Sequence, residues 1–262
     1  MERASVMFET GAATHIGKVR QCNEDSYTAR PEVGIWAVAD GMGGHESGDL
    51  ASHTVIDALE SIHDPHSAHD LLSLCEERIF DANARLKEIG RQRGGVIIGT
   101  TVTVLLTFDS YFACVWSGDS RIYMVRDGKI TQLSRDHTEV QHLLMSGAIT
   151  PEEARTWPDG NVITHAIGVA DIPELEMTSG PLNAGDVFVM CSDGLTQHVE
   201  DHEILRYASA SPSQQACERL IVLTLERGAV DNVTVIVVRY SPGREPSSDS
   251  NGNPLGAEES PA

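Results

Sequence analysis

Residues 100–126, TTVTVLLTFDSYFACVWSGDSRIYMVR, contain three short runs that are rich in β-branched and aromatic residues. The runs span 100–107, 111–117 and 121–126, and Asp, Ser or Gly separates each from the next, which is typical of strands. The links between them are too short to hold a crossover helix, so we expect neighbouring runs to pair as antiparallel strands. This stretch therefore predicts a sheet of antiparallel strands.

Further strands and three helices are expected around this stretch. Runs of the same kind lie at 34–40, 186–191 and 232–240. A helix is expected at about 212–227, with Ser211 as N-cap, Pro212 in the first turn and Gly228 past the end. Two other segments have apolar residues every three or four positions, which predicts amphipathic helices packed on a sheet. Their apolar residues are Ala51, Val55, Leu59 and Ile62 in the first, and Leu72, Cys75, Ile79, Ala82, Leu86 and Ile89 in the second.

Two segments are expected to lie outside this core. Residues 135–172 contain short helical pieces and several helix breakers but no run long enough for a strand, so we expect an excursion from the sheets. Residues 241–262 are rich in Ser, Pro and Gly and nearly free of large apolar residues. Because such a tail cannot bury enough apolar surface to offset its ordering entropy, we expect it to be disordered. The folded domain is therefore expected to span 1–240.

Composition and charge limit the partners and the location. The chain has 262 residues, of which 40% are hydrophobic and 22% charged, as in an ordinary globular protein. Its formal net charge of −20 argues against nucleic acid or an anionic membrane as the main partner, because both would repel it. No apolar run approaches the ~18 residues that span a bilayer, and the N-terminus does not resemble a signal peptide. We expect a cytoplasmic protein, with a monomer as the default.

The cysteines are expected to be structural. There are five, an odd number, and none forms a CxxC pair, which disfavours both a disulfide framework and a zinc site. Four of them lie within apolar patterns, so we expect these thiols to be buried. They are Cys75, Cys114, Cys191 and Cys217.

Acidic residues recur in tight-turn contexts, mostly where an apolar run begins or ends. Strand ends are places where turns bring distant residues together, so we expect these carboxylates to share one site. Hard oxygen ligands of this kind suit Mg²⁺ or Mn²⁺ better than zinc. A lone Asp-Gly is normally just a turn, but the joint pattern favours a metal site. The contexts are NED at 23–25, DGMGGH at 40–45, GDSR at 118–121, SDG at 192–194 and DN at 231–232.

The order of these motifs resembles that of the metal-dependent protein phosphatases of type 2C, over about 10–240. The resemblance implies a four-layer α-β-β-α sandwich of two antiparallel sheets flanked by helices, as in bacterial members that hold only the catalytic domain. It also implies that 135–172 is a flap that influences substrate choice, although a surface decoration is an equal alternative. The matching stretches are THIGKVRQCNEDSY, VADGMGGHESGDLAS, GTTVTVLL, WSGDSRIYMVRDG, CSDGL and DNVTVIVV.

We assign Asp40, which directly follows an apolar run, as the bridge between two Mn²⁺ or Mg²⁺ ions. By resemblance, Glu24 and the Gly41 carbonyl complete the shell of the second ion, while Asp193 and Asp231 hold the first. Two cations ~3.5–4 Å apart lower the pKa of a bridging water enough to supply hydroxide near neutral pH, placed for in-line attack on phosphorus.

Four more residues have roles implied by the resemblance. Asp25 orients metal-bound water and Asp119 binds a third, weaker ion, although simple turn roles stay open for both. Arg20, four residues before Glu24, binds phosphate through its planar fork. His45, with an unperturbed pKa near ~6.5, protonates the leaving serine or threonine oxygen, unless it only starts a helix.

These roles predict a metal-dependent protein serine/threonine phosphatase that acts on phosphoproteins and opposes a serine/threonine protein kinase. Two alternatives stay open. One is a catalytically silent module that binds phosphoproteins, against which the full acidic set weighs, and the other is a phosphoesterase for small molecules. Comparing the turnover of a phosphopeptide and a sugar phosphate would separate the two enzymes.

Overall fold

The fold rests on two antiparallel sheets in a computed structural model that describes residues 7–43, 47–154, 156–158, 160 and 162–242. The first sheet has the order β1 (Met7–His15), β11 (Val233–Ser241), β10 (Val187–Cys191), β7 (Arg121–Arg126) and β8 (Lys129–Gln132). The second has the order β2 (Asp25–Arg30), β3 (Ile35–Met42), β5 (Val102–Phe108), β6 (Tyr111–Ser117) and β9 (Glu176–Pro181). The short strand β4 (Gly99–Thr100) pairs with the end of β3.

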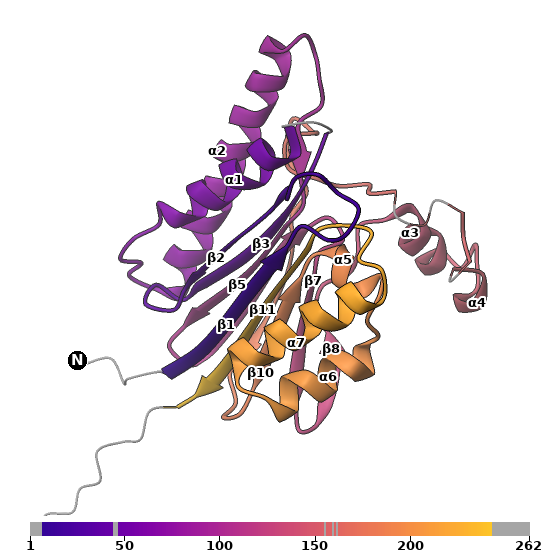
Figure 1. Ribbon diagram of the computed structural model, residues 1–262. Helices are drawn as coiled ribbons and strands as arrows, with labels where there is room; N and C mark the ends of the chain where they lie inside the picture. Colours follow the sequence, from indigo (N-terminus) through magenta and orange to yellow (C-terminus); the bar gives the residue numbers. More distant parts are fainter. Residues whose placement is uncertain (1–6, 44–46, 155, 159, 161, 243–262) are drawn as a thin grey trace, which may run out of the picture.

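Helices cover the outer face of each sheet, which gives four layers (Figure 1). On the second sheet these are α1 (Ser47–Glu60) and α2 (Ala68–Gln92), and on the first sheet α6 (Asp201–Ala210) and α7 (Ser213–Glu226). A single turn of helix, α5 (Asp193–Thr196), directly follows β10. The expected four-layer α-β-β-α sandwich is confirmed.

Alternation of side chains along the strands creates three apolar layers. In β3, Ile35, Ala37 and Ala39 pack against the helices, whereas Trp36 and Val38 point into the layer between the sheets. The same period of two directs the next residue, Asp40, to the end of that middle layer. The acidic residue is thus aimed inward by the pattern of the strand that carries it.

One expected pairing is wrong. The short link between 117 and 121 predicts that β6 and β7 are neighbours, but β6 pairs with β5 and β9, and β7 pairs with β10 and β8. The chain instead crosses from one sheet to the other at Gly118, whose φ of 110° suits glycine. Trp116 and Ile122 lie on either side of the crossing, and both contribute to the layer between the sheets.

The other predicted elements are present, with small shifts at their ends. Pro212 is the N-cap of α7 in place of Ser211, while Gly228 follows the helix with a φ of 122° as expected. Within the described part of 135–172 there is no extended strand, only α3 (Glu139–Met145), α4 (Pro151–Ala154) and single bridges. These helices lie to one side of the sandwich in Figure 1. Residues 243–262 of the predicted tail lie outside the described residues.

The cysteines are placed as expected. Cys75, Cys114, Cys191 and Cys217 are buried, and each described cysteine is a free thiol. Burial raises the pKa of the Cys75 and Cys191 thiols to about 12, so both stay protonated and unreactive near neutral pH. Among the residues that the structure describes, no helix is long and apolar enough to cross a bilayer.

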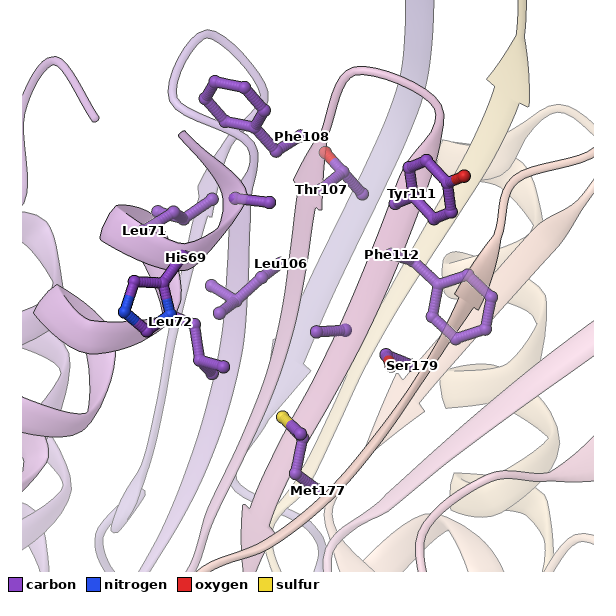
Figure 2. Close-up of a pocket in the computed structure, with 12 residues that line it drawn as sticks. His69, Leu71, Leu72, Leu106, Thr107, Phe108, Tyr111, Phe112, Met177 and Ser179 are labelled. Carbon is purple, nitrogen blue, oxygen red and sulfur yellow. The ribbon is translucent and has the colours of Figure 1, made fainter. Parts of the chain in front are cut away.

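An apolar hollow lies beside the first turn of α2, where the helix leaves β6 and β9 uncovered (Figure 2). The residues that line it include Leu72 of α2, Leu106 of β5, Tyr111 of β6 and Met177 of β9. The residues that line this hollow include none of the acidic residues expected at the metal site.

Candidate active site

The acidic residues gather where several strands end at the middle layer. Asp25 and Asp40 are cross-strand partners in the ladder of β2 and β3. Asp193 opens α5 directly after β10, and Asp231 lies two residues before β11. Asp119 lies in the crossing between β6 and β7. The two sheets therefore both contribute carboxylates to one cluster.

Three buried carboxylate oxygens in this cluster have no hydrogen-bond partner among the described residues: Glu24 Oε1, Asp25 Oδ1 and Asp119 Oδ1. Asp25 and Asp119 are only 5% and 6% exposed. A buried carboxylate oxygen without a donor is costly, because it has lost its water and gained nothing in return. Divalent cations with a preference for oxygen would satisfy these atoms, so the donor set fits Mg²⁺ or Mn²⁺.

The carboxyl groups also raise the pKa of one another. Burial, together with the charges of Asp193 and Asp231, raises the pKa of Asp25 to about 7. Burial and the charge of Asp193 raise the pKa of Asp119 to about 7 as well. For Asp40, burial and four neighbouring carboxylates raise the pKa well above its usual range. Such a cluster is fully ionised near neutral pH only if cations offset its charge.

Backbone hydrogen bonds hold the carboxylates that lie on the second sheet. The amide of Asp40 donates to Thr101 Oγ1 at 3.0 Å, and the amide of Thr101 donates to the Asp40 carbonyl at 2.8 Å. Gly41 donates to the Glu24 carbonyl at 3.1 Å. A Cβ at Gly41 would lie 2.0 Å from the Gly48 carbonyl oxygen, so only glycine fits at this position. The end of β3 and the start of α1 therefore pack in direct contact.

Asp25 is held by side chains of the first sheet. Ser192 and Thr234 both donate their hydroxyls to Asp25 Oδ2, at 2.8 and 2.7 Å. Its other oxygen, Oδ1, is left without a donor from the described protein. The carboxylate is therefore fixed in orientation through one oxygen and open at the other.

Arg20 lies at the rim of the cluster with its side chain 49% exposed. Its guanidinium donates to Asp231 Oδ2 at 2.5 Å, and this hydrogen bond raises the pKa of Arg20. The other nitrogens of its fork remain available for an anion at the mouth of the site.

The family follows from comparison with known proteins. A family model described as Protein phosphatase 2C matches residues 13–227. The chain belongs to the protein phosphatase 2C family. This phosphatase 2C chain is 37% identical over 238 residues to the serine/threonine protein phosphatase PstP of Mycobacterium tuberculosis, a match that covers 90% of the chain and 46% of that protein. The chain thus spans about half the length of that relative.

Solved structures show the same phosphatase 2C fold. The crystal structure of the Mycobacterium tuberculosis serine/threonine phosphatase PstP/Ppp matches with a TM-score of 0.84 and 37% identity, covering 90% of this chain and 99% of that one. A second structure, the catalytic domain of PstP in complex with two manganese ions, matches with a TM-score of 0.80 and 36% identity, covering 90% and 100%.

Of the nine residues expected at this phosphatase 2C site, seven come together, and their roles stay predictions. They are Arg20, Glu24, Asp25, Asp40, Gly41, Asp193 and Asp231 around the end of the middle layer. Asp119 lies beside them, and its charge acts on Asp40. His45, the expected general acid, lies outside the described residues.

The carboxylates are not arranged as a finished ligand cage in this phosphatase 2C chain. Within the described residues, no three acidic, histidine or cysteine side chains converge on one point closely enough to hold an ion. Several oxygens face protein donors instead: Asp231 accepts from Arg20, and Asp193 Oδ2 accepts from Gln197 Nε2 at 2.7 Å. Holding two ions would require these side chains to turn toward the unpaired oxygens of Glu24 and Asp25.

Sequence reasoning missed several residues that position the acidic ones. Asn232 accepts a hydrogen bond from the Glu24 amide at 2.8 Å and donates to the Ile16 and Cys22 carbonyls, so it ties the NED segment to β11. Asn232 and Ser192 stand inside the motifs DN and SDG, which could have indicated them. Thr234 had no such signal, because its role depends on which way β11 faces.

Proposed function

We propose that the chain is a Mn²⁺- or Mg²⁺-dependent protein phosphatase that hydrolyses phosphoserine and phosphothreonine. The observation that carries this proposal is the buried carboxylate cluster with unpaired oxygens on Glu24, Asp25 and Asp119. Membership of the phosphatase 2C family and the name of the Mycobacterium tuberculosis relative support the same activity.

The ions would be held as the resemblance implies. Asp40 would bridge two of them, with Glu24 and the Gly41 carbonyl on one side and Asp193 and Asp231 on the other, and Asp119 would hold a third, weaker ion. The manganese-bound structure of PstP supports two ions in the core site. When bound, such ions lower the pKa of coordinated water toward neutrality and offset the charge of the phosphoryl group.

The protein's own groups would orient the reactants. Because Ser192 and Thr234 both donate to Asp25 Oδ2, its Oδ1, which has no donor among the described residues, would be the oxygen that orients the attacking water. Arg20 would move from Asp231 to two phosphate oxygens, since phosphate competes for the same fork. We also propose that His45 protonates the leaving oxygen of the serine or threonine.

The natural substrates would be phosphoproteins produced by a serine/threonine protein kinase. A net charge of −20 disfavours nucleic acid and anionic membranes as competing partners. We further propose a monomer that works in the cytoplasm, where a reducing environment suits five free cysteines.

The test is phosphate release from a phosphothreonine peptide with Mn²⁺, with Mg²⁺ and after chelation. We expect release to depend on metal and Asp40→Asn to reduce it by at least ~10²-fold, because the bridge between the ions loses its charge. Asp57→Asn, at an exposed position on α1, serves as the matched control. A folded, metal-loaded chain that releases no phosphate would favour the silent binding module, and faster turnover of a sugar phosphate would favour the small-molecule enzyme.

A further inference from the structure

The 135–172 excursion starts on the same crossing that carries Asp119. Trp116 Nε1, at the end of β6, donates to the Arg135 carbonyl at 2.9 Å. The Arg121 guanidinium, at the start of β7, binds both oxygens of Asp136 at 2.6 to 3.0 Å. The first two residues of the excursion are therefore attached to both sides of the crossing.

His137, the next residue, contacts the crossing itself. It is 6% exposed, and its amide donates to the Gly118 carbonyl at 3.0 Å. In return the Gly118 amide donates to His137 Nδ1 at 3.2 Å. Because an amide N–H can only donate, Nδ1 must be the unprotonated ring nitrogen, and the ring proton resides on Nε2. Both polar backbone groups of Gly118 thus bond to one residue.

His137 is also bonded to the segment in which the excursion returns toward the sheets. The Thr164 amide donates to the His137 carbonyl at 2.8 Å, and the His137 ring packs edge-on against the ring of His165 at 4.7 Å between centroids. Its Nε2 has no hydrogen-bond partner among the described residues, and the nearest carboxylate oxygen, on Glu176, is 3.6 Å away. The ring is held mainly through Nδ1, which makes the contact with Gly118 its main polar function.

Gly118 in turn sets the position of Asp119. The residue before Asp119 is thus a glycine with a φ of 110°, and its two hydrogen bonds to His137 fix the direction in which the chain enters Asp119. On the other side, Ser120 Oγ lies 2.8 Å from Thr101 Oγ1, the oxygen that accepts from the Asp40 amide. The Asp119 turn is thus fixed between His137 and the Thr101 contact to Asp40.

We propose that His137 is a positioning residue which, by accepting the Gly118 amide hydrogen at Nδ1, orients Asp119 for a third, weakly held divalent cation. The inference rests on the proposed function only in taking Asp119 as a cation ligand.

The test compares His137→Asn with His137→Leu. The Oδ1 of asparagine can stand where His137 Nδ1 stands and accept the same amide hydrogen, whereas leucine fills the space without an acceptor. Mn²⁺ binding is titrated by electron paramagnetic resonance, which counts bound ions without any substrate. We expect His137→Leu to weaken the third ion by about tenfold, the weight of one hydrogen bond, and His137→Asn to bind within about threefold of the unmodified chain. The tighter ions should be unchanged in both.

His142→Leu is the control, since His142 belongs to α3 in the same excursion and its ring makes none of the contacts to Gly118. Equal weakening in the asparagine and leucine variants, or none in either, would overturn the proposal. If His137→Leu does not fold, hydrogen exchange of the Gly118 amide in the unmodified, Mg²⁺-loaded chain decides. Slow exchange supports the hydrogen bond, and exchange as fast as in an exposed loop overturns it. A chain that binds three ions but releases no phosphate would contradict the proposed function and leave the proposal about His137 standing.

Discussion

Asp25 has one oxygen that accepts two hydroxyl hydrogens and one that accepts none from the described part of the chain. The two oxygens of this carboxylate, Oδ2 and Oδ1, can therefore have different functions. The satisfied oxygen fixes the orientation of the group, and under the proposed function the other oxygen is the one that orients a water. A carboxylate that met solvent on both oxygens would turn freely and would orient a water poorly.

Thr234→Val should therefore lower turnover without unfolding the protein. Valine keeps the shape of threonine but removes the donor to Asp25 Oδ2, so we expect kcat to fall by roughly tenfold and KM to change little. Thr234→Ser keeps the hydroxyl and should stay within a few-fold of the unmodified chain. Steady-state kinetics on a phosphothreonine peptide at saturating Mn²⁺ measures both. Native turnover in the valine variant would show that Ser192 alone orients Asp25.

At the scale of elements, the crossing from β6 to β7 decides how the two sheets are connected. A Cβ at Gly118 would lie 2.6 Å from the Thr101 side chain, whereas a Cβ at Gly128, in the β7–β8 turn, meets nothing within 4 Å among the described atoms. Both glycines have positive φ, at 110° and 72°. Alanine would therefore strain the backbone at both positions, but it would clash with a neighbouring side chain only at Gly118.

Gly118→Ala should destabilise the chain more than Gly128→Ala. We expect Gly128→Ala, the control, to lower the unfolding free energy by about 1 kcal/mol because of backbone strain. Gly118→Ala should lower it by about 2 kcal/mol more than the control does, because its Cβ would clash with the tightly packed Thr101. Urea unfolding with matched slopes gives both values. Equal losses would mean that the crossing can relax away from Thr101.

The pairing of strands around this crossing could be predicted only in part from the sequence. The hairpin of β5 and β6 was predictable because both runs are apolar and their link is short. The separation of β6 from β7 was not, because a link of similar length can close a hairpin or change sheets, and packing of Trp116 and Ile122 decides between them. β1 was missed because its sequence, MFETGAATH, is rich in small and polar residues and is recognised as a strand only through its partner β11.

The acidic residues were easier to find than the groups that hold them. Each carboxylate stands in a turn motif that the sequence displays, so the set could be named without any structure. Gln197 and Thr234 act through contacts between strands that are far apart along the chain, and no local pattern marks such contacts. Thr101 became recognisable only when β5 was placed beside β3.

For the whole molecule, the carboxylate cluster predicts opposite pH profiles with and without metal. Asp25 and Asp119 have a pKa of about 7 in the folded chain, against ~3.9 in an unfolded one. Between these values the folded state binds more protons than the unfolded state, so the unfolding free energy of the chelated protein should fall as the pH rises from ~4 to ~7. Ion binding displaces those protons, so stabilisation by Mn²⁺ should grow over the same range.

Thermal unfolding at pH 5.5, 6.5 and 7.5, with Mn²⁺ and with chelator, measures this difference. We expect the gap between the two melting temperatures to widen at each step. Asp119→Asn removes one of the two groups and should flatten the chelated profile, while Asp57→Asn, at an exposed position on α1, should leave the widening unchanged. A gap that stays constant with pH would mean that the carboxylates are already ionised in the folded chain.

The placement of β11 has a consequence for how the molecule is made. β11 is the last strand of the described residues, yet it lies inside the first sheet, between β1 and β10, and Asp231 lies two residues before it. During synthesis, the N-terminal strand β1 must wait for a partner that emerges more than two hundred residues later. A nascent chain halted before residue 231 would lack both Asp231 and an inner strand of that sheet, so the carboxylate cluster and the sheet that supports it are completed together, late in synthesis.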